Sequence, residues 1–198
     1  MRASQGKFIL FDIDEFAAWL NRMVIGRPVT RIQNHHTWTP SYADFDGNNH
    51  FALLAGMEES HLGRGFDEIG QNLTTFPDGA VAVCRSLELI PACTRDANVG
   101  TVCIENLGNF DIGGDLVSDA QRSAIIQLNA VLCSALHITP NSDSIVYHHW
   151  YDLETGERRN GSGKTKSCPG TNFFGGNEVA DADAHFIPLI AKQVSGLI

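Results

Sequence analysis

The segment from Thr101 to Leu107 and the two patterns that follow it constrain the fold more than any other part of the chain. Thr101–Leu107 is largely apolar and contains one carboxylate, Glu105, which is typical of a buried strand. Ser118 then begins a long amphipathic helix, whose apolar residues recur at helical spacing: Ile125, Leu128, Val131, Leu132, Ala135 and Leu136. A short strand follows at 145–148. A strand, a helix and a strand in this order predict an α/β fold.

Weaker patterns complete the expected order of elements. They predict helices over 13–24 and 49–62, a short strand over 29–33, and a β-hairpin of 70–76 and 80–85 around the turn Pro77-Asp78-Gly79. The second helix would carry on one face Phe51, Leu54, Ala55, Glu58 and Leu62. A polar, Gly-rich loop is expected over 151–167, and helix again from Asp181. No internal repeat or low-complexity linker interrupts the 198 residues. We therefore expect one domain, residues 1–198, with a single core.

Composition excludes several classes of partner. The net charge of −9 argues against nucleic-acid binding and against simple electrostatic adhesion to an anionic membrane or cell wall. No run of about eighteen apolar residues appears, so no membrane span is expected. The first ten residues lack the apolar stretch and small-residue cleavage site of a signal peptide.

The segment Lys166-Ser167-Cys168-Pro169-Gly170 lies downstream of two histidine doublets, His35-His36 and His148-His149. One cysteine and one histidine from each doublet make a three-ligand set, which is typical of catalytic zinc sites with an open fourth position. A structural zinc site would use four ligands in close pairs, and the chain has no CxxC or HxxxH pair. Single histidines are more often surface or hydrogen-bonded residues, and His50, His61, His137 and His185 keep that interpretation.

The expected strands can bring the set together. His35, Glu105 and His148 lie on or just after three different strands, and neighbouring strands are only about 5 Å apart. The two members of each doublet must point in different directions along a strand, so one can face the site. Glu105 is costly to bury alone, which indicates a partner or a function. Lys166 is expected to favour the thiolate of Cys168.

Two other interpretations of the cysteines remain open. Cys168 could be the nucleophile of a metal-free hydrolase, although such cysteines usually begin a helix beside a single base. Of the other four cysteines, Cys103 and Cys133 lie in apolar stretches and are expected to be buried small side chains. Cys84 and Cys93 could close a short loop, but the spacing does not require it.

Four motifs in order carry a family resemblance. They are Ile32-Gln33-Asn34-His35-His36-Thr37, the run Val102 to Asn109, Ile145-Val146-Tyr147-His148, and Lys166 to Gly170. Together they resemble the zinc-dependent N-acetylmuramoyl-L-alanine amidases, a family that includes phage amidase-type lysozymes and peptidoglycan recognition proteins. The resemblance spans about residues 29–175. It implies a mixed central sheet flanked by helices, a fold that agrees with the expected elements.

The resemblance also implies roles for individual residues. The zinc ligands would be His35, His148 and Cys168, with His36 and His149 as the alternatives one residue on. Lys166 matches a catalytic lysine, and Glu105 matches an acidic position that some bacterial members carry. Two departures stand out. Gln71 replaces a tyrosine that many active members have after the glycine of the hairpin, so Glu105 would carry more of the proton transfer. The segment between His148 and Cys168 is also longer than in the phage enzymes, and would form one wall of the groove.

By this resemblance the chain would be a zinc-dependent hydrolase of the amide between N-acetylmuramic acid and L-alanine in peptidoglycan. Zinc would lower the pKa of a water toward ~7. The alternative is a non-catalytic peptidoglycan-binding module on the same fold.

Three settings fit the absence of a visible signal peptide: phage release, an extracellular wall enzyme delivered by another route, or cytoplasmic recycling. A wall-binding module would lie outside this sequence. Stem-peptide specificity and oligomeric state are not encoded in these motifs.

Overall fold

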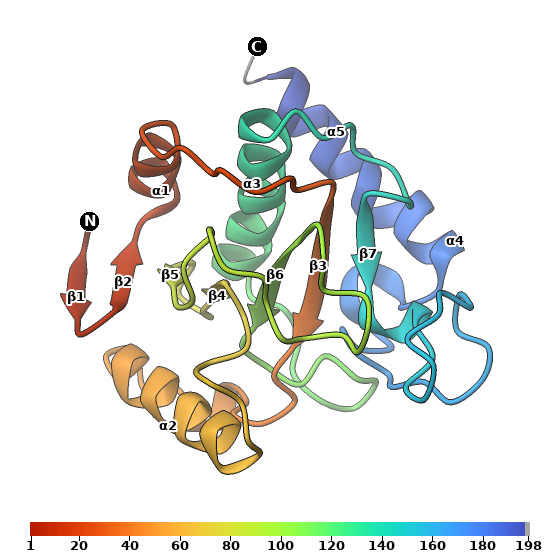
Figure 1. The fold of residues 1–198 in the computed structure, drawn as a ribbon, viewed down its shortest axis with the longest axis horizontal. Coiled ribbons are helices and arrows are strands. Elements are labelled where there is room, and N and C mark those ends of the chain that lie inside the picture. Colours follow the sequence, from red (N-terminus) through yellow and green to blue (C-terminus); the bar gives the residue numbers. More distant parts are fainter. Residues whose placement is uncertain (197–198) are drawn as a thin grey trace.

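A seven-stranded mixed sheet forms the centre of the computed structural model, which describes residues 1–196 (Figure 1). The strand order across the sheet is β1-β2-β5-β4-β6-β3-β7. The strands are β1 (Ala3–Gln5), β2 (Phe8–Phe11), β3 (Arg31–His36), β4 (Leu73–Thr75), β5 (Val81–Val83), β6 (Thr101–Asn106) and β7 (Ile145–Tyr147). The α/β architecture expected from the sequence, with helices around a mixed sheet, is confirmed.

The half of the sheet that contains the histidine strands is parallel. β6 pairs in parallel with β4 on one side and β3 on the other, and β3 pairs in parallel with β7. Parallel strands end at the same edge of a sheet, where open α/β folds usually place their binding sites. β3, β6 and β7 therefore end at one place, which brings together His35 near the end of β3 and His148 directly after β7.

The helices cover the two faces of the sheet unequally. α1 (Ile13–Leu20), α3 (Asp119–Ala135) and α5 (Ile187–Ser195) pack on one face, around the larger apolar core (Figure 1). α2 (His50–Gly63) packs on the other face through Leu54 and Met57, and forms a smaller core with β2 and β5. Short helical segments complete the chain: Tyr42–Asp44, His148–Trp150, Phe173–Gly175, α4 (Val179–Asp181) and Ala182–Phe186. The smaller core leaves part of the second face open beside β3 and β6.

Local sequence signals explain where the helices begin and end. The Ser118 side chain accepts a hydrogen bond from the backbone N–H of Gln121, so Ser118 is the N-cap of α3 as predicted. Pro188 lies in the first turn of α5, where its missing N–H costs no helical hydrogen bond. α1 ends at Leu20, earlier than predicted, and β3 extends to His36. The N-terminal hairpin of β1 and β2 was not predicted.

Two expectations about side chains are wrong in part. The predicted face of α2 included Leu54 and Leu62; Leu54 is buried, but Leu62 is 49% exposed, and His50 and Met57 are buried in addition to Leu54. Cys103 was expected to be a buried small side chain; it is buried, but it is not a free thiol, since it forms a disulfide with Cys93. β6 carries Cys103 on the face covered by the loop that contains Cys93, so the two sulfurs meet.

The other cysteines are free. Cys84, Cys133 and Cys168 are buried and unbonded, so the loop closure between Cys84 and Cys93 does not occur. Among residues 1–196, no helix is both long enough and apolar enough to cross a membrane.

Candidate metal centre and groove

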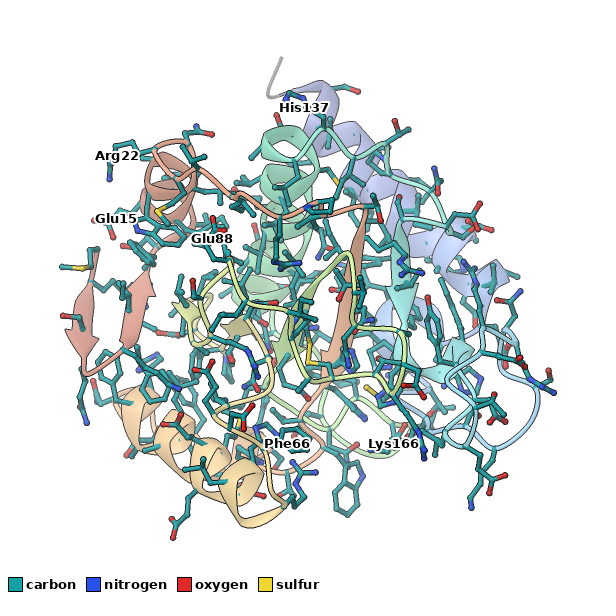
Figure 2. All side chains as sticks on the ribbon, in the orientation of Figure 1. Glu15, Arg22, Phe66, Glu88, His137 and Lys166 are labelled. Atoms are coloured by element: carbon teal, nitrogen blue, oxygen red, sulfur yellow. A yellow bond between two sulfur atoms is a disulfide. The ribbon has the colours of Figure 1, made fainter. Side chains whose placement is uncertain are left out.

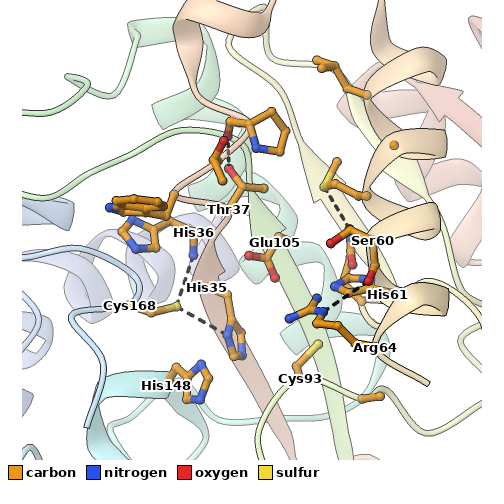
Figure 3. A pocket seen from close by; sticks show the side chains of 18 of the residues that line it. His35, His36, Thr37, Ser60, His61, Arg64, Cys93, Glu105, His148 and Cys168 are labelled. Atoms are coloured by element: carbon orange, nitrogen blue, oxygen red, sulfur yellow. Dashed lines mark hydrogen bonds between the residues drawn. The ribbon is translucent and has the colours of Figure 1, made fainter. Parts of the chain in front are cut away.

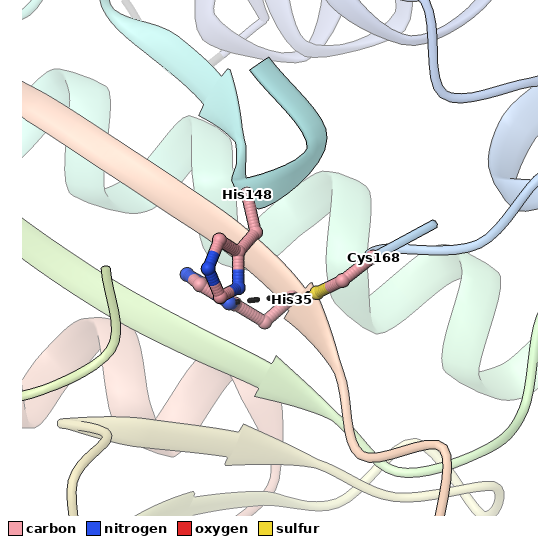
Figure 4. Close-up of side chains that lie close together, drawn as sticks. All are labelled: His35, His148 and Cys168. Carbon is pink, nitrogen blue, oxygen red and sulfur yellow. Dashed lines mark hydrogen bonds between the residues drawn. The ribbon is translucent and has the colours of Figure 1, made fainter. Parts of the chain in front are cut away.

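Three side chains predicted as metal ligands converge at the carboxyl edge of the parallel strands. His35 comes from β3, His148 from the helical turn that follows β7, and Cys168 from a loop far along the chain (Figure 4). One potential ligand atom from each lies within 4.8 Å of the others. Nδ1 of His35 is 3.5 Å from Sγ of Cys168, and the two imidazole rings are 4.8 Å apart between centroids. Two imidazoles and one thiol at this spacing match the donor set that zinc prefers.

The second histidine of each doublet has another contact. His36 accepts a hydrogen bond at Nδ1 from the backbone N–H of Phe110, 3.2 Å away. Nδ1 of His149 donates to the backbone carbonyl of Lys166 over 2.7 Å, and the backbone N–H of His149 donates to the carbonyl of Cys168, also over 2.7 Å. His149 thus fastens the segment that carries Lys166 and Cys168. In each doublet the first histidine faces the cluster.

Burial keeps the cluster uncharged in the absence of a metal. The pKa of His35 is well below 6.5, because of burial and then because of the nearby His148. Burial also lowers the pKa of His148 to about 3. Both rings are therefore neutral, which is the form that binds metals.

Cys168 departs from the expectation of a thiolate. Burial raises its pKa well above 9, and the carboxyl of Glu105 raises it further, while Lys166 lowers it by a smaller amount. A metal ion would supply the positive charge that the neutral thiol lacks, so binding would release a proton. Cys168 also lies outside any helix, which disfavours the metal-free nucleophile.

The cluster lies at one end of a pocket of about 1020 Å³ (Figure 3). One wall is the segment from His36 to Pro40, and another is the exposed side of α2. The loop residues Ala92 and Cys93 and the segment 166–168 complete the lining. Lys166 and Phe66 lie at the end of the molecule toward which β3 points, whereas His137 lies at the opposite end (Figure 2). The pocket is thus a groove that runs from the histidine cluster toward the end of α2.

Glu105 lies beside the cluster. It is the register partner of His35 on the adjacent parallel strand, so both side chains project from the same face of the sheet. Burial raises the pKa of Glu105 to about 8, although Lys166 and Arg64 lower it. Its side chain forms no hydrogen bond or ion pair with another residue of the described 1–196. A carboxyl group with a pKa near neutrality can both take up and release a proton there.

Lys166 is the cation closest in sequence to the cluster. Its side chain is exposed, lines the groove, and forms no ion pair within residues 1–196. It lowers the pKa of His35 and His148, which is the effect of a positive charge close to the cluster. The ammonium group is free to approach a ligand in the groove.

Three groove residues were not selected from the sequence as groove contacts. Trp38 directly follows His35-His36-Thr37, is 58% exposed, and has a positive φ of 59°. Arg64 points from the end of α2 into the groove, as Figure 3 shows, and its guanidinium lies over the Phe66 ring at 5.3 Å. Gln71, which stands where the family tyrosine was expected, is fully buried and its Oε1 has no hydrogen-bond partner. Of the three, the sequence had drawn attention only to Gln71, as the replacement of the tyrosine. The position of Trp38 next to the first doublet is a signal that could have found it.

Solved structures with the same fold are amidases and recognition proteins. N-acetylmuramoyl-L-alanine amidase LysC from Clostridium intestinale is 22% identical, with a TM-score of 0.56 over 76% of this chain and 82% of that one. Drosophila PGRP-LB is 19% identical, with a TM-score of 0.61 over 81% and 82%. Peptidoglycan recognition protein-LE, solved with tracheal cytotoxin, is 21% identical, with a TM-score of 0.58 over 75% and 78%. At these identities the likeness concerns the fold.

The sequence itself identifies the family. No curated protein matches the chain at a significant level. The sequence model described as N-acetylmuramoyl-L-alanine amidase, however, matches residues 25–171, which include both histidine doublets, Glu105 and Cys168. Since this match covers well over half of the chain, the protein belongs to the N-acetylmuramoyl-L-alanine amidase family.

Proposed function

We propose that the protein is a zinc-dependent N-acetylmuramoyl-L-alanine amidase, which hydrolyses the amide bond between N-acetylmuramic acid and the L-alanine of the stem peptide. The observation that carries the proposal is the convergence of His35, His148 and Cys168 beside Glu105 at the end of a groove. The donor chemistry fits zinc: two neutral imidazoles and a thiol that a cation would deprotonate. His35, His148 and Cys168 would hold the ion.

Zinc in this position would supply Lewis acidity toward a carbonyl oxygen and would lower the pKa of water toward ~7. The protein side chains account for the remaining requirements of amide hydrolysis. The Lys166 ammonium, which forms no ion pair with a carboxylate of residues 1–196, would stabilise the negative charge that develops on the amide oxygen. One donor aimed at such a charge contributes about 3–4 kcal/mol to transition-state stabilisation.

Glu105 would move the proton. Hydrolysis needs a group that accepts a proton from water and then delivers it to the departing amine of L-alanine. With a pKa of about 8, the Glu105 carboxyl is mostly protonated at neutral pH and becomes ionised as the pH rises through 8, so it can exchange a proton in this range. A positioned acid–base group contributes roughly 10²–10⁴-fold to the rate. This supports the expectation, drawn from Gln71 in place of the family tyrosine, that Glu105 carries more of the proton transfer here.

The side chains that line the groove are suited to a substrate with a sugar and an attached peptide. Trp38 offers an exposed aromatic face on one wall, where the apolar face of a sugar ring could stack. Arg64, which forms no ion pair within residues 1–196, offers a cation at the α2 end, suited to a carboxylate of the stem peptide. The solved complex of peptidoglycan recognition protein-LE with tracheal cytotoxin, a diaminopimelic acid-type peptidoglycan fragment, is consistent with this substrate class.

The test is hydrolysis of purified peptidoglycan, followed by mass spectrometry of the soluble fragments and by the release of L-alanine amino termini. The wild-type protein should release stem peptides that begin with L-alanine, and a chelator should abolish this activity. Cys168→Ser should lose both zinc and activity, whereas Cys133→Ser changes a buried cysteine outside the groove and should retain both. Binding of peptidoglycan without release of new amino termini would instead identify a recognition module.

A further inference from the structure

The amide of Gln33 lies buried two residues before His35 on β3, and therefore on the same face of the sheet. Its side chain is 1% exposed. Nε2 of Gln33 donates a hydrogen bond to the backbone carbonyl of Ala97 over 2.8 Å. Because a carbonyl oxygen can only accept, this bond fixes which end of the amide faces which way. The oxygen Oε1 is left on the side of His35.

The position of Oε1 determines where His35 carries its proton. Oε1 lies 3.3 Å from Nε2 of His35 and 3.2 Å from the hydroxyl of Thr94. An amide oxygen can only accept, so Nε2 of His35 is the protonated nitrogen. Nδ1 then has the free lone pair, and Nδ1 is the atom that lies 3.5 Å from Sγ of Cys168. The nitrogen able to bind a metal is the one that faces the other two candidate ligands.

Gln33 is held in turn by a single loop. Thr94 and Ala97 both belong to the segment 93–98, in which the Asn98 side chain accepts hydrogen bonds from the backbone N–H groups of Cys93 and Thr94. The disulfide to Cys103 fastens this segment to β6. Cys103 is also the register partner of Gln33, so the disulfide lies next to the amide that it supports.

We propose that Gln33 is a positioning residue, which holds His35 in the tautomer that can bind the metal, and that the loop closed by Cys93 and Cys103 keeps Gln33 in place. Histidines that bind metals commonly donate their other N–H to a fixed acceptor, and loss of that acceptor weakens metal binding about 10–100-fold. The inference rests on the proposed zinc site but not on cleavage of any substrate.

The first measurement is zinc affinity by competition with a chromophoric chelator. Gln33→Met keeps the volume and removes the acceptor, and should weaken zinc binding about 10–100-fold. Gln33→Glu keeps a hydrogen-bond acceptor and should lose less zinc affinity than Gln33→Met. The matched control is Asn129→Leu, since Asn129 is a buried amide in α3 that bonds to Asn34, away from the groove. The zinc affinity of this control should stay within about threefold of that of wild type.

The second measurement is the tautomer of His35 in the metal-free protein, from two-bond ¹⁵N–¹H correlations. Wild type should show the proton on Nε2, and Gln33→Met should show a mixture or a proton on Nδ1. If Gln33→Met fails to fold, Gln33→Asn keeps a buried amide that is one methylene too short to reach both Ala97 and His35. It should produce the same loss of affinity.

The outcomes separate this inference from the proposed function. A wild-type proton on Nδ1, or folded Gln33 variants with wild-type zinc affinity and tautomer, would overturn the role of Gln33 and leave the amidase proposal intact. A protein that binds zinc, depends on Gln33 for it, and still releases no L-alanine would retain the inference and refute the amidase. A wild-type chain that binds no zinc would overturn both before any variant is compared.

Discussion

His149 donates a hydrogen bond from Nδ1 to the backbone carbonyl of Lys166, and its own backbone N–H binds the carbonyl of Cys168. His149, the neighbour of the candidate ligand His148, thus orders the segment that carries Lys166 and Cys168. Cys168 is another candidate ligand, and Lys166 is the candidate catalytic cation. The arrangement explains how a long loop can end in two residues with fixed positions. It also gives the second histidine of the doublet a role of its own.

Replacement of His149 should therefore impair the site without removing a ligand. We expect His149→Ala to lower kcat and zinc affinity about 10-fold, because the 166–168 segment loses its side-chain anchor. His149→Asn can present an N–H near the position of Nδ1 and should recover most of the loss. Glu178→Gln alters the partner of the other ring nitrogen and serves as the control. Equal activity of His149→Ala and wild type would contradict the anchoring role.

The stability of the metal-free protein should fall at both ends of the pH range, for different reasons. Burial lowers the pKa of His36 to about 4 and that of His148 to about 3. The unfolded chain takes up protons below pH 6.5 that the folded chain resists, so stability declines as pH falls from 6.5 toward 3. Urea unfolding at several pH values, with a chelator present, measures this decline.

Glu105 should produce the opposite slope. Its pKa is raised to about 8, so its stabilising contribution is complete below pH 4.5 and is lost as pH rises through 8. One such group changes the free energy of unfolding by at most about 1.4 kcal/mol per pH unit. Between pH 6.5 and 8 the free energy of unfolding of wild type should fall, while that of Glu105→Gln should stay nearly constant. Parallel curves for the two proteins would show that Glu105 has an ordinary pKa.

Trp38 should have opposite effects on stability and binding. Its φ of 59° is unfavourable for any residue with a Cβ, by roughly 1–2 kcal/mol, and glycine avoids this cost. Trp38→Gly should therefore be about 1 kcal/mol more stable than Trp38→Ala in urea unfolding. Both variants lose the exposed ring and should raise KM several-fold, with a smaller change in kcat. A wild-type KM in both would exclude a substrate contact at Trp38.

The Cys93–Cys103 disulfide should stabilise the protein measurably. The two cysteines are 10 residues apart, and closing a loop of that size lowers the entropy of the unfolded chain by an amount equivalent to about 2–3 kcal/mol. Cys93→Ala combined with Cys103→Ala should lose that much stability. A reducing agent should lower the stability of wild type to a similar degree and leave the double variant unchanged, which provides the internal control.

The sequence predicted the part of the fold that positions the site. β6, α3 and β7 were recognisable because each has a strong apolar pattern and a clear boundary, such as Ser118 before α3. The hairpin of β1 and β2 was missed because strands of three and four residues are too short to show a period. The buried face of α2 was assigned wrongly, since contacts with β2 and β5 outweighed its own weak pattern.

The candidate ligands were also predictable, but their environment was not. Strand alternation predicted that one histidine of each doublet faces the site. The family resemblance singled out His35 and His148, which lie together with Cys168. Lys166, two residues before Cys168, was visible in the sequence and was expected to lower the pKa of the thiol. Burial raises that pKa by more than Lys166 lowers it, and burial is a property of the folded chain. The partner of Cys103 was equally hidden, because the path of the loop from Cys93 decides it.

The parallel register of β3, β6 and β7 has a consequence for the order of folding. His35 is more than a hundred residues of chain away from both His148 and Cys168, and the three side chains meet only after the strands have paired and the last loop has docked. Contacts of such long range form late, because the intervening chain must be closed first. Zinc uptake would therefore report completed assembly, and a nascent or truncated chain would remain without metal until its final third had arrived.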